Sequence, residues 1–171
     1  LQNLENVIQQ DIQLIWQTGK LEYSQIVGRW KMEDGKNAAN ESLQNTQLPT
    51  SIHIKEFISD MALAYSAADI IVSRAGAIAI SELAVAAKPL ILVPFPYAAE
   101  DHQTKNALSL VENDAAKMVK DVEMKDHFWK TLSNLINDEA ERNTMSENLK
   151  NLAKPTATQN IVDEILKTIL K

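Results

Sequence analysis

The sequence predicts an α/β fold in which helices cover both faces of a parallel β-sheet, a Rossmann-like doubly wound layout. Segments with helical apolar spacing alternate along the chain with short segments typical of strands. The middle strands are unbroken apolar runs, "DIIVS" and "PLILVPF". Such runs are typical of parallel strands that are buried on both faces.

The first third of the chain contains two strands that alternate apolar and polar residues. Apolar residues at helical spacing predict a helix through residues 1–8, and alternation predicts a strand at 11–16. A helix is expected at 21–32, followed by an Asn-rich loop with some helix at 33–50. A second alternating strand is predicted at 51–57.

The remainder repeats strand–helix units and ends in three helices. The expected elements are a helix from Asp60 to 67, strands at 69–73, 89–95 and 115–119, and helices at 77–87 and 102–113. Pro94 and Pro96 end the strand at 89–95, because proline cannot donate to a ladder. The last helix carries Ile161, Ile165 and Ile169 in one stripe, which we expect to pack on the core.

Composition excludes several functional classes. The 171 residues include no cysteine, so a disulfide scaffold and a thiolate metal site are excluded. Only three histidines are present, without ligand spacing, and no metal or other cofactor is expected. The formal net charge of −6 disfavours nucleic acid as a partner. Neither a signal peptide nor an apolar run of about 18 residues, enough to cross a membrane, is visible.

Ligands of doubly wound sheets bind beyond the carboxyl ends of the strands. The stretch "SRAGAIAISEL" at 73–83 begins at one such strand end and is therefore a candidate ligand site. A helix that starts at Gly76 among small residues could hold a pyrophosphate on its free N–H groups. The alternative is an ordinary strand-to-helix turn. Glu82 lies one turn farther along and could bind a ribose diol, or could simply be solvated.

The stretch "AEDHQTKN" at 99–106 follows the next strand. Asp101 could cap the helix, which would place His102 and Gln103 in its first turn, where both suit sugar hydroxyls. The alternative is a capped helix with polar first-turn residues and no ligand. No G-x-S-x-G or Walker A pattern is present, so a serine hydrolase and a P-loop enzyme are disfavoured.

Three runs in this order, residues 56–83, 88–107 and 115–119, resemble the carboxyl-terminal domain of the MurG family, in glycosyltransferase family 28. The resemblance implies the carboxyl-terminal half of a GT-B fold and an inverting, metal-independent hexosyltransferase. Its donor would be UDP-N-acetylglucosamine and its acceptor lipid I, in peptidoglycan synthesis. It also implies peripheral contact with the cytoplasmic face of the bacterial inner membrane.

The resemblance also assigns donor-binding positions, from the base to the sugar. The uracil site is matched by Phe57, Ile58 and Met61, with the Ile58 backbone reading the base edge. The diphosphate site is matched by Gly76, Ala77, Ile78 and Ala79. The ribose site is matched by Glu82 and the sugar site by Gln103, with Arg74 and His102 beside these residues.

Three departures from the family pattern stand out. Ala75 and Ala79 replace a Ser and a Thr, which removes two hydroxyls near the diphosphate. The family often has two consecutive Gln after an Asp-Arg pair, whereas here Asp101 and His102 are followed by Gln103 and Thr104, which puts a second sugar contact in doubt. The Gly-Gly-Ser loop after the family's first strand is missing, together with that strand.

These features lead us to expect that residues 1–171 are one donor-binding domain of a longer protein. Acceptor binding, the catalytic base and membrane contact would belong to an amino-terminal domain ahead of Leu1, and this chain alone would be inactive. Two alternatives stay open. One is another GT-B enzyme, either a glycolipid glycosyltransferase or a UDP-N-acetylglucosamine epimerase, and the other is a stand-alone UDP-sugar-binding subunit of a two-chain transferase.

Overall fold

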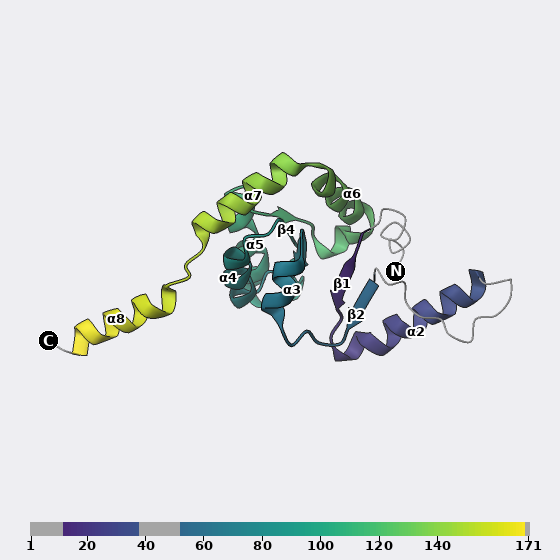
Figure 1. The fold of residues 1–171 in the computed structure, drawn as a ribbon, viewed down its shortest axis with the longest axis horizontal. Coiled ribbons are helices and arrows are strands. Elements are labelled where there is room, and N and C mark those ends of the chain that lie inside the picture. Colours follow the sequence, from purple (N-terminus) through teal and green to yellow (C-terminus); the bar gives the residue numbers. More distant parts are fainter. Residues whose placement is uncertain (1–11, 38–51, 170–171) are drawn as a thin grey trace. The chain divides into compact units, whose positions relative to one another are not determined.

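The computed structural model describes residues 12–37 and 52–169, shown in colour in Figure 1. The predicted helix at 1–8 and most of the Asn-rich loop lie outside these residues. The elements are β1 (Leu14–Gln17), α2 (Lys20–Asn37), β2 (Ile52–Lys55), α3 (Met61–Ala67), β3 (Ile71–Ser73), α4 (Ala77–Ala86), β4 (Leu90–Leu92), a 3₁₀ turn (Ala99–Asp101), α5 (His102–Val111), β5 (Lys117–Met118), a second 3₁₀ turn (Asp121–Glu123), α6 (Met124–Asn137), α7 (Glu139–Leu152) and α8 (Ala157–Ile169).

The chain divides into two compact units, Leu1–Ala64 and Tyr65–Lys171. In the described part of the first unit, β1 pairs with β2; in the second, the strand order is β3-β4-β5. All these pairs are parallel, which confirms the predicted α/β class. The described strands therefore form two sheets, one in each unit.

The first unit has the alternation that the sequence predicts. Ile52 and Ile54 of β2 are buried, whereas the alternating His53 and Lys55 are exposed. Apolar side chains of β1 and of the start of α2 pack against the two isoleucines. The helix α2 continues to Asn37, five residues into the segment at 33–50 where loop with some helix is expected.

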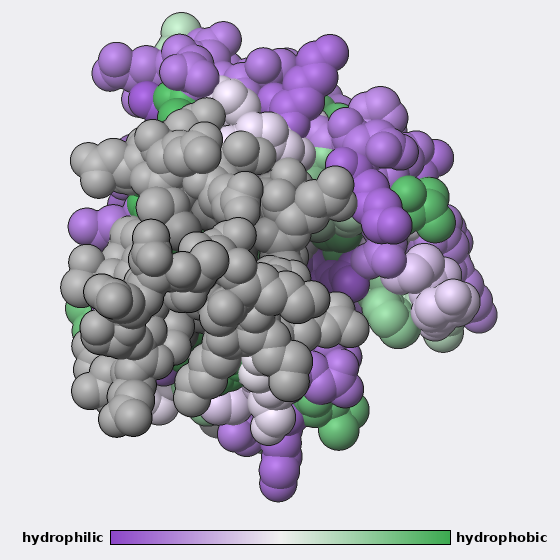
Figure 2. Space-filling model, turned by 90° about the vertical axis from the view of Figure 1, so that its right-hand side faces the viewer, coloured by the Kyte–Doolittle hydropathy of each residue, from purple (hydrophilic) through white to green (hydrophobic). Residues whose placement is uncertain are grey.

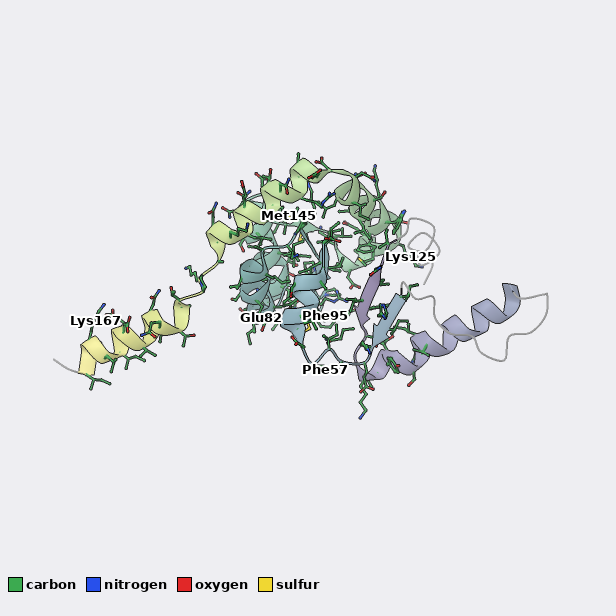
Figure 3. The ribbon with its side chains drawn as sticks, viewed as in Figure 1. Phe57, Glu82, Phe95, Lys125, Met145 and Lys167 are labelled. Carbon is green, nitrogen blue, oxygen red and sulfur yellow. The ribbon has the colours of Figure 1, made fainter. Side chains whose placement is uncertain are left out.

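The second unit is built around β4, which pairs with β3 on one side and β5 on the other. Leu90, Ile91 and Leu92 are each 0% exposed, as expected for a central parallel strand. Helices α4, α5, α6 and α7, the strand β3 and the segments between elements contribute the other buried side chains of this core. The Met145 sulfur of α7 accepts a hydrogen bond from the Leu90 N–H at 3.0 Å (Figure 3).

Two expectations about this unit need correction. The β4 ladder covers Leu90–Leu92 rather than 89–95, although Val93 N–H still donates to Ser73 O at 2.8 Å. The stripe on α8 does not pack on the core, since Ile161, Ile165 and Ile169 are 52–70% exposed. The chain before α8 is extended at Ala153 and contains Pro155, which separates α8 from the packed helices.

The surface agrees with the acidic, polar composition. In Figure 2 hydrophilic residues predominate among the coloured atoms of the face shown, and hydrophobic ones form small separate spots. Within residues 12–37 and 52–169, no helix combines the length and the apolar character needed to cross a membrane.

Candidate functional site

The carboxyl ends of β3, β4 and β5 lie at one edge of the second unit's sheet, because all three strands are parallel. Backbone bonds continue the pairing to this edge, with Val119 N–H donating to Leu92 O at 2.9 Å. The segments that leave the edge are 74–76, 93–98 and 119–123. The first segment includes Arg74 and Gly76 and leads directly into α4, and the second leads through a 3₁₀ turn into α5; this edge is where α/β sheets bind ligands.

The helix α4 starts at this edge without a side-chain cap. Gly76 is its N-cap residue, and no side-chain hydrogen bond satisfies the first-turn N–H groups. Those groups have no acceptor inside the helix and carry its positive dipole end. The N–H groups of Ala77, Ile78 and Ala79 thus have no partner within α4 or from a capping side chain, and their use as an anion cradle stays a prediction.

Gly76 is not needed for a tight turn. Its φ of −67° and ψ of 147° are values that any residue adopts, so the backbone conformation here does not require glycine. A Cβ built on Gly76 would have no heavy atom within 4 Å. The glycine thus leaves space open above the start of α4.

This open space leads to a prediction for Gly76→Ala. The stability of the fold should change by no more than about 1 kcal/mol, because the backbone suits alanine and nothing clashes with its methyl group. The affinity for UDP should fall, because the methyl group occupies the path to the α4 amides. Thermal unfolding and calorimetric titration with UDP measure the two effects; unchanged affinity would contradict the cradle.

Ala75 precedes the cradle and is 0% exposed. A serine hydroxyl at this position would lie inside the core, so its absence does not remove a surface contact to phosphate. The Ala75 N–H donates to Oε1 of Gln103 at 3.2 Å, and its carbonyl accepts from Nδ2 of Asn106 at 3.0 Å. Oε1 of Gln103 also accepts from the Phe95 N–H at 2.9 Å.

Arg74 is placed at the edge by contacts within the protein. Its Nη1 donates to the carbonyls of Val93 and Pro94, both at 3.2 Å, and to Oδ1 of Asp121 at 2.6 Å. Its guanidinium carbon lies 5.7 Å from the centre of the Phe95 ring. Arg74 therefore joins the ends of all three strands, and this nitrogen is already occupied by acceptors.

Glu82 lies on the exposed surface of α4, one turn beyond the cradle (Figure 3). The hydroxyl of Tyr65 donates to its Oε2 at 3.4 Å, which is a long hydrogen bond. Burial raises the pKa of Tyr65 above its ordinary value of 10.0, and the Glu82 charge and hydrogen bond raise it further. Tyr65 was not among the predicted site residues, because nothing in its local pattern distinguishes it from a core aromatic.

The raised pKa of Tyr65 predicts a pH dependence of stability. Folding favours the protonated hydroxyl, so its contribution is fully present below pH 10 and is lost as the pH rises through the folded-state pKa. The stability difference between wild type and Tyr65→Phe should thus be constant between pH 7 and about 9 and shrink above pH ~10. Urea unfolding at several pH values tests this; a difference that persists unchanged at high pH would contradict it.

The start of α5 differs from the expected cap. Asp101 occupies the N-cap position with a φ of +54°, but its carboxylate accepts from the Thr104 hydroxyl at 2.6 Å and not from a backbone N–H. The exposed His102 places Nδ1 2.7 Å from the Ala99 carbonyl. Because the carbonyl can only accept, Nδ1 is the donor in this hydrogen bond.

The first unit contains the residues expected to hold uracil. The Phe57 side chain is 73% exposed, and Ile58 and Met61 are half-buried. The Ile58 N–H donates to Oε1 of Gln17 at 2.8 Å, a contact from the end of β1 that the sequence did not predict. This N–H can read a base edge only if Gln17 releases it.

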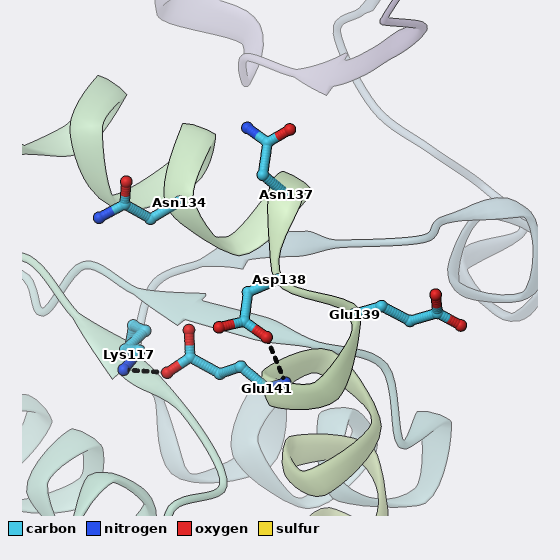
Figure 4. A pocket seen from close by; sticks show the side chains of 6 residues that line it. All are labelled: Lys117, Asn134, Asn137, Asp138, Glu139 and Glu141. Atoms are coloured by element: carbon cyan, nitrogen blue, oxygen red, sulfur yellow. Dashed lines mark hydrogen bonds and ion pairs between the residues drawn. The ribbon is translucent and has the colours of Figure 1, made fainter.

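A polar hollow lies elsewhere in the second unit, at the start of β5 and the junction of α6 and α7 (Figure 4). Its charges are partly paired: Lys117 forms an ion pair with Glu141, and Asp138 accepts from the Glu141 N–H at 2.8 Å. The hollow is away from the carboxyl ends of the strands. In the described part of the chain, no three His, Asp or Glu side chains gather as metal ligands would.

Comparison with known proteins identifies the family. The model of the glycosyltransferase family 28 C-terminal domain matches residues 1–161. The chain belongs to this family. Among curated relatives, the UDP-N-acetylglucosamine--N-acetylmuramyl-(pentapeptide) pyrophosphoryl-undecaprenol N-acetylglucosamine transferases are similar. The one from Bacteroides thetaiotaomicron is 45% identical over 81% of this chain, and the one from Cytophaga hutchinsonii is 43% identical over 85%.

Solved structures agree with the family 28 assignment. The crystal structure of Acinetobacter baumannii MurG matches with a TM-score of 0.65 and 32% identity, over 88% of this chain and 40% of that one. The spinosyn forosaminyltransferase SpnP shares the fold, with a TM-score of 0.59 and 13% identity over 77% of this chain and 33% of its own. The chain spans about a third of the length of the two curated relatives.

Proposed function

We propose that the protein containing this chain transfers N-acetylglucosamine from UDP-N-acetylglucosamine to the undecaprenyl-pyrophosphoryl-N-acetylmuramoyl-pentapeptide, lipid I, and that this chain binds the donor. The observation that carries the proposal is the uncapped start of α4 with Glu82 one turn beyond it. The names of relatives up to 47% identical to this chain supply the donor and the acceptor.

The proposed reaction is a direct displacement at the anomeric carbon of the donor. An acceptor sugar hydroxyl attacks this carbon, its proton passes to a base, and the bond to the β-phosphate oxygen breaks with the electron pair leaving on UDP. The amides of Ala77, Ile78 and Ala79 stabilise the charge that develops on the diphosphate. The base is expected outside this chain.

The proposal divides the donor among residues of the second unit. Glu82 accepts hydrogen bonds from the ribose hydroxyls, and the first turn of α4 holds the diphosphate. Gln103 and His102 lie at the start of α5, where sugar hydroxyls would bind. The assignment of uracil to Phe57, Ile58 and Met61 stays a prediction from the family resemblance. Because the acceptor is linked to a polyprenyl lipid, the reaction would take place at a membrane. The family resemblance assigns it to the cytoplasmic face, where the protein would bind peripherally.

A transfer assay on the full-length protein tests this function. Labelled UDP-N-acetylglucosamine is incubated with a soluble lipid I analogue, and labelled disaccharide product is expected together with one UDP for each transfer. A diacylglycerol acceptor serves as the control. Epimerised UDP-sugar without transfer, or transfer to diacylglycerol only, would instead support another GT-B enzyme. Binding without any transfer would support a separate donor-binding subunit.

A further inference from the structure

Two carboxamide side chains of α5 hold the peptide groups on either side of Ala75. Gln103 Oε1 accepts from the Ala75 N–H at 3.2 Å, and Asn106 Nδ2 donates to the Ala75 carbonyl at 3.0 Å. Both bonds are partly buried and join positions 28 and 31 residues apart in the sequence. Gln103 Oε1 also accepts from the Phe95 N–H at 2.9 Å, so one oxygen joins the segments after β3 and β4.

Beyond the end of the strand ladder, these side-chain bonds satisfy the backbone groups that the ladder no longer pairs. The last strand-like bond to β3 is the one from Val93 N–H to Ser73 O, and Ala75 lies two residues beyond it. Ala75 is fully buried, so an unpaired N–H or carbonyl here would be costly. Peptide groups are planar, so fixing the carbonyl of Ala75 also fixes the N–H of Gly76, the N-cap residue of α4.

On the basis of the proposed function, we propose that Gln103 and Asn106 are positioning residues that hold the start of α4 in the orientation in which its amides bind the donor's diphosphate. The two N–H donors on Oε1 also fix the orientation of the Gln103 carboxamide. Both lone pairs of that oxygen are then used, so Gln103 can contact a ligand only as a donor, through Nε2.

Asn106 provides the first test, because its side chain binds a backbone carbonyl that precedes the cradle. Asn106→Leu keeps the approximate shape and removes the donor. In the full-length protein, we expect the UDP affinity to fall about threefold to tenfold, the usual effect of one hydrogen bond, and the uridine affinity to stay unchanged. Asn113→Leu is the matched control, because the Asn113 side chain donates to Ser109 O within its own helix region.

Gln103 provides a second test with a readout that needs no ligand. Protein labelled with ¹⁵N-alanine reports the amide resonances of Ala75, Ala77 and Ala79. Gln103→Glu keeps an oxygen that accepts from the two N–H groups, whereas Gln103→Met keeps none. We expect the amide shifts of Ala77 and Ala79 to move in Gln103→Met and Asn106→Leu but to stay near wild type in Gln103→Glu and Asn113→Leu.

The outcomes separate this proposal from the proposed function. The positioning role is wrong if Asn106→Leu leaves the amide shifts of Ala77 and Ala79 unchanged and either weakens UDP and uridine binding equally or weakens neither. If Gln103→Glu shifts the amides as much as Gln103→Met does, the acceptor role of Oε1 is wrong. If wild type binds UDP no more tightly than uridine, the diphosphate site of the proposed function fails, while the amide shifts still decide the positioning role.

Discussion

Glu82→Ala is expected to weaken binding of UDP-N-acetylglucosamine by about 1–3 kcal/mol, roughly 5-fold to 150-fold, measured by calorimetric titration of the full-length protein. The carboxylate on the exposed surface of α4 is proposed to accept hydrogen bonds from two ribose hydroxyls. Hydrogen bonds to a charged group are worth more than neutral ones, which sets the upper part of this range.

The control variant is Glu147→Ala, which removes an exposed carboxylate from the middle of α7 and should leave the affinity unchanged. A second comparison uses 2′-deoxy-UDP. Wild type should bind it more weakly than UDP, and Glu82→Ala should bind the two alike. If Glu82→Ala keeps the wild-type preference for ribose, the carboxylate does not contact the diol.

Leu92→Ala should lower the free energy of unfolding by about 2–5 kcal/mol, the usual cost of a cavity in a packed core. Leu92 is 0% exposed in the central strand β4, between β3 and β5, so neighbouring side chains have little freedom to fill the space. Urea unfolding followed by circular dichroism measures the change.

The matched control is Leu166→Ala, the same substitution at a residue of α8 that is 47% exposed. Its effect should stay within about 0.5 kcal/mol, as is usual for surface substitutions. An equal loss in both variants would mean that α8 packs against other residues in solution. A small loss at Leu92 would contradict the central position of β4 in the core.

The two predictions differ in how much the structure adds to them. The burial of β4 could be predicted from its unbroken apolar run, and the position of Glu82 from helical spacing after "SRAG". What remained open for Glu82 was its environment, because the contact with Tyr65 joins two different helices, α3 and α4. A partner of that kind leaves no local pattern in the sequence.

Local spacing also led to two wrong predictions. The isoleucine stripe of α8 is typical of a helix that packs on a core, yet every described residue of that helix is exposed. Asp101 has the position and residue type of a helix cap, but its left-handed backbone turns the carboxylate toward Thr104. In both cases the periodicity identified the helix correctly, and the path of the chain leading into it determined its contacts.

The sequence by itself determined the α/β class and the order of strands and helices in the described residues, and it predicted candidate residues after the carboxyl ends of the strands. These follow from periodicity and chain order, which are local properties. Only the tertiary structure decided which atoms are already occupied. Arg74 Nη1 binds Asp121, 47 residues away, and Gln103 Oε1 binds two backbone N–H groups from different segments. Such bonds depend on how distant segments pack, and neither partner's neighbours in the sequence indicate them.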